Sequence, residues 1–118
     1  MTIALTDLDR DELLALCRRR IFFVSAYDLL DAKCDVASAR HKAADATLLA
    51  AVKRIPAALD VYRTAKGDRA RESAWSAYRL LEQAYRKENA KQKRLWRQLE
   101  KLWAERDAAL AAHSKGAA

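Results

Sequence analysis

Glycine and proline are almost missing from the 118-residue chain, which contains Pro56, Gly67 and Gly116 as its complete set. Sheet proteins need frequent turns, and turns draw heavily on these two residue types. Hydrophobic residues make up 52% of the sequence, largely as alanine and leucine, which favour helices. The sequence therefore predicts an all-α fold.

Helix boundaries follow from the few breakers. Thr6 or Asp7 can cap a first helix, and no breaker follows before Pro56. We expect one helix over residues 6–55 and a short connecting helix, or a kinked continuation, over residues 56–66. Gly67 is a natural helix stop and Asp68 a natural cap, so a last helix is expected over residues 68–112 with a flexible tail at 113–118. All of it is expected to form one domain.

Both long segments show a heptad pattern, with apolar positions alternating three and four residues apart. The first seam comprises Leu13, Leu16, Arg20, Phe23, Tyr27, Leu30, Cys34, Ala37, His41, Ala44, Leu48, Ala51 and Ile55. The second comprises Ala74, Tyr78, Leu81, Tyr85, Glu88, Gln92, Leu95, Leu99, Leu102, Arg106 and Ala109. Two such helices with a short connector predict a long antiparallel, coiled-coil-like hairpin, which we expect to assemble into a helical bundle.

The register of this hairpin can be predicted from its polar seam residues. When the numbers of facing residues add up to 129, Leu30 meets Leu99 and His41 meets Glu88. A slip of one heptad would place His41 against Leu95 and bury unpaired polar groups, at about 1–3 kcal/mol each. We therefore expect His41 and Glu88 to form a buried polar pair that fixes the register.

Tryptophans widen the apolar band of the last helix beyond its seam. Trp75, Trp96 and Trp103 fall on one edge at multiples of seven residues. A two-helix hairpin cannot cover such an edge, and an uncovered apolar patch promotes association. The sequence therefore predicts a self-associating interaction or scaffold protein, with a dimer favoured and an unidentified protein partner as a further expectation. Its expected interface residues are Leu14, Ile21, Val24, Trp75, Trp96 and Trp103.

Positive charge is concentrated in the C-terminal half of the chain. The net charge is +7, of which residues 60–118 contribute +6. Lysines and arginines on one helix face can follow a phosphate backbone and release its counterions. The alternative function is therefore nucleic-acid binding without strong sequence specificity, since no helix-turn-helix pattern accompanies the charges. The expected contacts are Lys87, Lys91, Arg94 and Lys101.

Side chains that could carry catalysis or bind a metal are few. Cys17 and Cys34 are expected to be small buried thiols. A stripe of Asp28, Asp31 and Asp35 is expected to be a solvated acidic face, because the partner helix offers mostly cations. We therefore expect no catalytic, cofactor-binding or metal-binding residues, and the predicted module is not an enzyme.

The stretch LDRDELLALCRRR, from Leu8 to Arg20, resembles the first helix of the all-helical chorismate mutases, and Arg20 matches the arginine at the end of that run. The resemblance covers about a tenth of the chain. DRARE, from Asp68 to Glu72, has the spacing of that family's Asp-x-x-Arg-Glu segment but comes some thirty residues late. The family also needs an upstream arginine, where this chain has Ile3 or Ala4. A chorismate-mutase-like helical enzyme is the most distant alternative that the resemblance implies.

Hydropathy and the N-terminal residues bear on location. The N-terminus lacks the basic and apolar regions of a signal peptide, and no run of 18 apolar residues occurs in the sequence. The sequence therefore predicts a cytoplasmic protein that does not interact with membranes.

Overall fold

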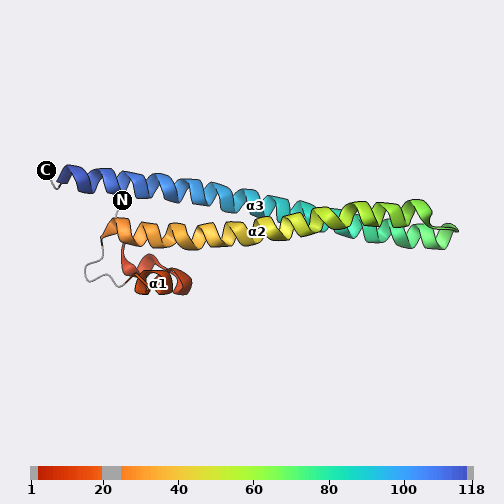
Figure 1. The fold of residues 1–118 in the computed structure, drawn as a ribbon, viewed down its shortest axis with the longest axis horizontal. Helices are drawn as coiled ribbons and strands as arrows, with labels where there is room; N and C mark the ends of the chain where they lie inside the picture. The colour runs from red at the N-terminus through yellow and green to blue at the C-terminus, as the bar shows by residue number, and fades with distance from the viewer. Residues whose placement is uncertain (1–2, 20–24, 117–118) are drawn as a thin grey trace. The chain divides into compact units, whose positions relative to one another are not determined.

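The computed structural model describes residues 3–19 and 25–116, with side chains up to residue 112. A short 3-10 helix η1 (Leu5–Asp7) precedes three α-helices: α1 (Arg10–Cys17), α2 (Ala26–Thr64) and α3 (Asp68–Gly116) (Figure 1). Helices α2 and α3 have 39 and 49 residues. They form a long helical hairpin, which confirms the predicted all-α fold.

The predicted first helix over residues 6–55 is wrong, because two separate helices occupy that range. Helix α1 is capped by Asp9, whose carboxylate accepts from the Glu12 N–H at 2.9 Å, and it ends at Cys17. Helix α2 has its own cap, in which Asp28 N–H donates to Ser25 Oγ at 3.2 Å and Ser25 N–H donates to Asp28 Oδ2 at 3.0 Å. This reciprocal Ser-x-x-Asp cap starts a new helix.

Pro56 lies inside α2, so the predicted separate helix over residues 56–66 is wrong and the first long helix continues through Pro56 to Thr64. Proline removes one i to i−4 hydrogen bond from the helix, and the side chain of Pro56 is exposed. The start of the last helix at Asp68 is confirmed, and Gly67 precedes it with φ of 90°. Helix α3 continues to Gly116, four residues beyond its predicted end.

The chain divides into two compact units, each built from segments of the hairpin helices. Unit 1 comprises Met1–His41 and Leu95–Ala118, and unit 2 comprises Lys42–Arg94. In unit 1, α1 lies along α2 (Figure 1), where Leu8 and Leu16 pack with Leu29 and Ala32 in one apolar cluster. Leu30 and Leu99 are also buried in unit 1.

Cross-helix contacts fix the register, and it differs from the predicted one. In unit 1, Arg106 Nη1 donates to Asp31 Oδ1 at 3.1 Å and the His41 ring lies 5.1 Å from that of Trp96. In unit 2, Tyr62 and Trp75 have ring centroids 5.3 Å apart.

The residue numbers of each of these pairs add up to 137, so the predicted sum of 129 is wrong by about one heptad. The prediction rested on the cost of burying His41 and Glu88 without partners, but both residues are partly exposed, so that cost does not decide the register. Because α2 continues to Thr64, its seam extends into the short connector and the pairing shifts accordingly.

The described helices include none with the length and apolar character required to cross a membrane.

Replacement of Pro56 by alanine should stabilise the protein. Alanine restores the N–H that proline lacks and has the highest helix propensity, so the free energy of unfolding should rise by up to about 3 kcal/mol. Urea denaturation followed by far-UV circular dichroism measures the change. Ala57→Gly, at the adjacent exposed position, is the control and should lower the free energy by about 1 kcal/mol. An unchanged or lower stability of Pro56→Ala would contradict the assignment of Pro56 to a helix interior.

Candidate interaction surfaces

Asp31 holds three elements of unit 1 together. It accepts hydrogen bonds from Arg19, which follows α1, and from Arg106 of α3 at 3.1 Å, while Arg19 also pairs with Asp35. Asp28 instead caps α2. The prediction of a solvated acidic face is therefore wrong for Asp31, which is half-buried and joined to two arginines.

These contacts shift the ionisation of the groups involved. Burial alone would raise the pKa of Asp31, but the hydrogen bonds from Arg19 and Arg106 outweigh it and lower the pKa below its usual 3.8. Hydrogen bonding to Asp31 raises the pKa of Arg106. The carboxylate of Asp31 therefore stabilises the folded state as an anion.

Other ion pairs neutralise the acidic start of α1. Glu12 is buried, and its Oε1 pairs with Lys33 Nζ at 3.1 Å. Arg40 contacts Asp9 at 2.9 Å and Asp11 at 3.3 Å. The pKa of Asp9 is lowered first by the backbone N–H of Glu12 and then by Arg40. Much of the charge of unit 1 is thus paired within the unit.

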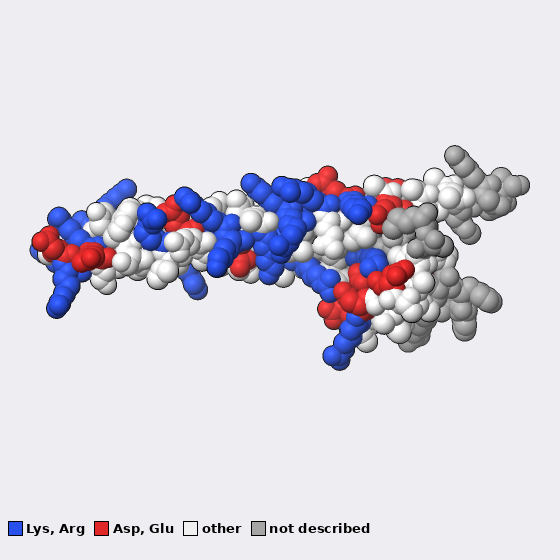
Figure 2. Space-filling view, turned by 180° about the vertical axis from the view of Figure 1, so that it is seen from behind, with Lys and Arg blue, Asp and Glu red and all other residues white. Residues whose placement is uncertain are grey.

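The two units differ sharply in net charge. Unit 1 has ten basic and ten acidic side chains, whereas unit 2 has thirteen basic and six acidic ones and therefore carries the whole net charge of +7. Within unit 2, which is described throughout, the structure shows one ion pair, between Arg86 and Glu82 at 2.7 Å. On the face seen in Figure 2, lysine and arginine (blue) cover more of the surface than aspartate and glutamate (red).

The predicted nucleic-acid contacts divide between the units. Lys87, Lys91 and Arg94 are exposed on α3 in unit 2 and lie at i, i+4 and i+7, which places them on one face of the helix. We call these three residues the cationic face. Lys101 lies in unit 1, where it lines a pocket.

More large apolar side chains are exposed than buried among the described residues. The buried ones are five leucines, all in unit 1. Ten large apolar side chains are exposed: Leu5, Leu13, Leu14, Leu49, Val52, Val61, Trp75, Leu80, Trp96 and Leu110. Five of the ten belong to unit 2, whose buried hydrophobic residues are two alanines, Ala44 and Ala74. Unit 2 therefore lacks a core of large side chains.

The exposed apolar residues of unit 2 lie on both edges of its helix pair. Val52 and Trp75 are both one position after a seam residue, and such positions share one edge of an antiparallel pair. Leu49 precedes Val52 by three residues and extends the same edge. We call these three residues the tryptophan edge; their exposed fractions are 55% for Leu49 and 42% for Val52 and Trp75. Val61 and Leu80 lie toward the opposite edge.

Aromatic contacts leave the tryptophans partly uncovered. Trp75 contacts Tyr62 and also Tyr78, whose ring centroid is 5.4 Å away. Trp96 contacts His41 and also Trp103 at 5.6 Å, yet remains 41% exposed.

The predicted interface residues have different outcomes. Leu14, Trp75 and Trp96 are exposed, and Trp103 is half-buried. Ile21 and Val24 lie outside the described residues. The predicted buried pair is wrong, because His41 and Glu88 are each partly exposed and the ring of His41 packs on Trp96.

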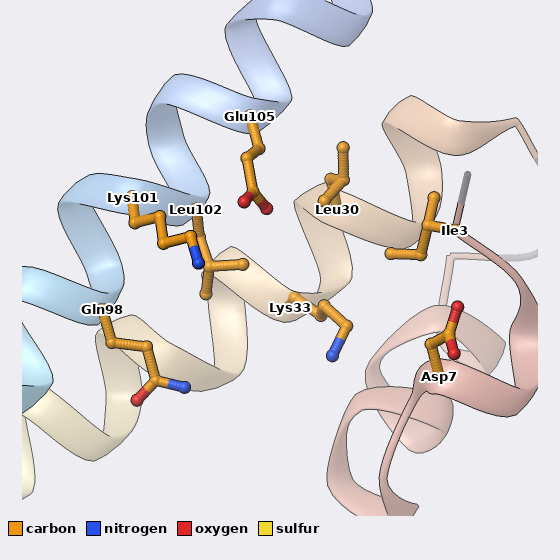
Figure 3. A pocket seen from close by; sticks show the side chains of 8 residues that line it. All are labelled: Ile3, Asp7, Leu30, Lys33, Gln98, Lys101, Leu102 and Glu105. Carbon is orange, nitrogen blue, oxygen red and sulfur yellow. The ribbon is translucent and has the colours of Figure 1, made fainter. Parts of the chain in front are cut away.

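A pocket of about 290 Å³ in unit 1 brings together charged side chains from three segments (Figure 3). Lys33 of α2, and Lys101 and Glu105 of α3, surround the apolar side chains of Leu30 and Leu102. Its remaining lining residues are Ile3, Asp7 and Gln98. The pocket has two ammonium and two carboxylate groups, and its lining includes no histidine, cysteine or hydroxyl side chain.

The remaining candidates for chemistry are dispersed. Cys34 is buried, and burial raises its pKa, whereas Cys17 is exposed, contrary to prediction. Across the described residues, no group of three or more histidine, cysteine or acidic side chains has the geometry to hold a metal ion. Of the residues that resemble chorismate mutases, Asp68, Arg71 and Glu72 are exposed at the start of α3, and Arg20 lies outside the described residues.

Neither protein-family models, nor curated proteins, nor solved structures give a match to this chain. Its function must therefore be inferred from the surfaces described above.

Asp31→Asn should destabilise the protein near neutral pH. The neutral amide cannot replace the charge that Arg19 and Arg106 share, so the free energy of unfolding should fall by about 1–3 kcal/mol. Asp35→Asn removes a more exposed carboxylate that pairs with Arg19 alone, and should cost less than about 1 kcal/mol. Urea denaturation of both variants measures the difference, and equal losses would contradict the central role of Asp31.

The contribution of Asp31 should also depend on pH. Its pKa is lower in the folded state, so its stabilising effect is complete above the usual pKa of 3.8 and is lost as the pH falls through the lowered folded-state value. The stability difference between wild type and Asp31→Asn should therefore shrink on acidification. A difference that stays constant from neutral pH to below pH ~3 would contradict this ionisation.

Proposed function

We propose that this protein is a non-enzymatic helical interaction module that self-associates, with a dimer as the favoured state. The observation that carries the proposal is the burial deficit of unit 2, where large apolar side chains are exposed and the buried hydrophobic residues are two alanines. Burial of one large apolar side chain contributes about 1.5–3 kcal/mol, so a second copy that covers these residues gains substantial free energy.

The tryptophan edge is the surface that a second copy fits best. Leu49 and Val52 come from α2 and Trp75 from α3, so this edge has exposed apolar side chains from both helices of the pair. A dimer related by a two-fold axis brings the same edge of each chain together. Two hairpins packed in this way form a four-helix arrangement, in which the tryptophan edge of each chain becomes interior.

Electrostatics opposes this association. Each copy of unit 2 carries a net charge of +7, and the exposed cations Arg79, Arg86 and Lys93 border the tryptophan edge on α3. Salt screens repulsion between exposed like charges, with a Debye length of about 10 Å at 0.1 M. Burial of apolar surface does not suffer from this screening. Association through the tryptophan edge should therefore become stronger as the salt concentration rises.

A matched pair of double variants tests the proposed interface. Leu49→Gln with Val52→Gln removes apolar groups from the tryptophan edge without changing the charge, and should raise the dimer dissociation constant at least about 100-fold. Val61→Gln with Leu80→Gln makes the same replacements away from that edge, at side chains that are 59% and 68% exposed, and should leave the constant within about threefold. Size-exclusion chromatography with light scattering, over a dilution series and at two salt concentrations, measures both.

Three results would contradict the proposal. These are a wild type that is a stable monomer at micromolar concentration, equal weakening of association by the two double variants, and dissociation of the dimer by added salt. Far-UV circular dichroism of each variant checks that its helices are retained.

A further inference from the structure

We propose that unit 2 binds the phosphate backbone of nucleic-acid duplexes through its cationic face, Lys87, Lys91 and Arg94. This function is separate from self-association, and it is carried by the unequal division of charge between the two units. Unit 1 balances its ten cations with ten anions, and unit 2 has thirteen cations against six anions.

The cations of the two units also differ in what they contact. In unit 1, Arg19, Lys33, Arg40 and Arg106 are all engaged with carboxylates and contribute to the fold. In unit 2, Arg86 is the one cation that the structure shows in an ion pair. Ion pairs within the fold therefore do not account for the positive charge of unit 2. A partner with regularly spaced anions would account for it.

When α3 lies parallel to a duplex axis, the length of the cationic face covers several phosphates of one strand. From Lys87 to Arg94 is seven residues, or about 10 Å at 1.5 Å per residue. One DNA strand places a phosphate every 3.4 Å along the helix axis, so this length spans about three phosphates. All three side chains are exposed on the same face of α3, and the long stems of lysine and arginine can adjust to the curvature of the strand.

The position of the apolar residues favours a nucleic acid over a membrane surface. A helix that lies on a membrane needs a broad apolar face directed into the lipid, with cations at its borders. In unit 2 the cationic face has Leu80 as its exposed apolar neighbour, seven residues before Lys87, whereas the tryptophan edge lies on the other side of the α3 seam. The two surfaces are therefore separate, and a duplex can bind while a second copy covers the tryptophan edge.

The binding should not depend on the base sequence. Lysine and arginine on phosphates position a protein without reading bases. Three phosphate contacts give a slope of about −2.7 for the logarithm of the association constant against the logarithm of salt concentration. The affinity should therefore fall about 40-fold between about 50 mM and 200 mM salt. This salt dependence is opposite to that expected for self-association.

Fluorescence anisotropy with the full chain and a labelled DNA duplex of mixed sequence, two helical turns long, tests the proposal. Lys87→Gln with Lys91→Gln should lower the affinity and reduce the salt slope by about 2. Arg10→Gln with Arg18→Gln removes the same charge from exposed positions of unit 1 and is the matched control. It should leave the slope unchanged.

Four results with the wild type and these two double variants would overturn the proposal. These are no binding of the duplex at low salt, binding that does not change with salt, equal losses in both double variants, and tighter binding to vesicles of anionic phospholipid than to the duplex. The dimer-disrupting variant Leu49→Gln with Val52→Gln separates the two proposals. If it is monomeric and still binds the duplex with the same salt slope per chain, nucleic-acid binding stands apart from self-association; if it loses the slope, the assignment to the cationic face is wrong.

Discussion

Packing along a narrow seam is the constraint on which this structure depends. A helix pair covers one stripe on each helix, and unit 2 devotes its buried positions to Ala44 and Ala74. Alanine allows close approach but contributes little burial, so larger side chains remain at the edges. In unit 1, Leu16 of α1 and Leu8, which precedes α1, pack against Leu29 and Ala32 of α2. The two units thus represent a covered and an uncovered form of one hairpin.

Charge follows the same division. Where α1 covers the hairpin, ion pairs such as those of Asp31 accompany the apolar contacts and leave unit 1 neutral. Unit 2 has neither the covering helix nor the compensating acids. An apolar edge and a cationic face therefore occur together on the part of the chain with the smallest core, which is why both proposed interactions are assigned to it.

Local sequence signals predicted the helical class and the start of α3 at Asp68, because breakers are rare and their effect is local. Other boundaries failed for equally local reasons. The Ser25–Asp28 cap competes with continuation of the first helix, and the heptad pattern of Leu13 and Leu16 extends across the break without revealing it. Register could not be predicted, since it depends on where α2 ends, and a single proline does not determine that. Exposure of Trp75 and Trp96 follows from a two-helix seam, but the neutrality of unit 1 depends on which acids and cations meet in three dimensions.

Pro56 has a consequence for whatever covers the tryptophan edge. The carbonyl of Val52 is the group whose i to i−4 donor proline removes, and Val52 belongs to that edge. The carbonyl oxygen of Val52 therefore lacks its helical hydrogen bond and belongs to a residue of this apolar edge. A covering surface that excludes water would leave this oxygen without a donor. Such a surface is therefore expected to place a hydroxyl, an amide or a bound water within hydrogen-bonding distance of it. The need for this one hydrogen-bond donor can therefore distinguish between apolar surfaces that would otherwise cover the edge equally well.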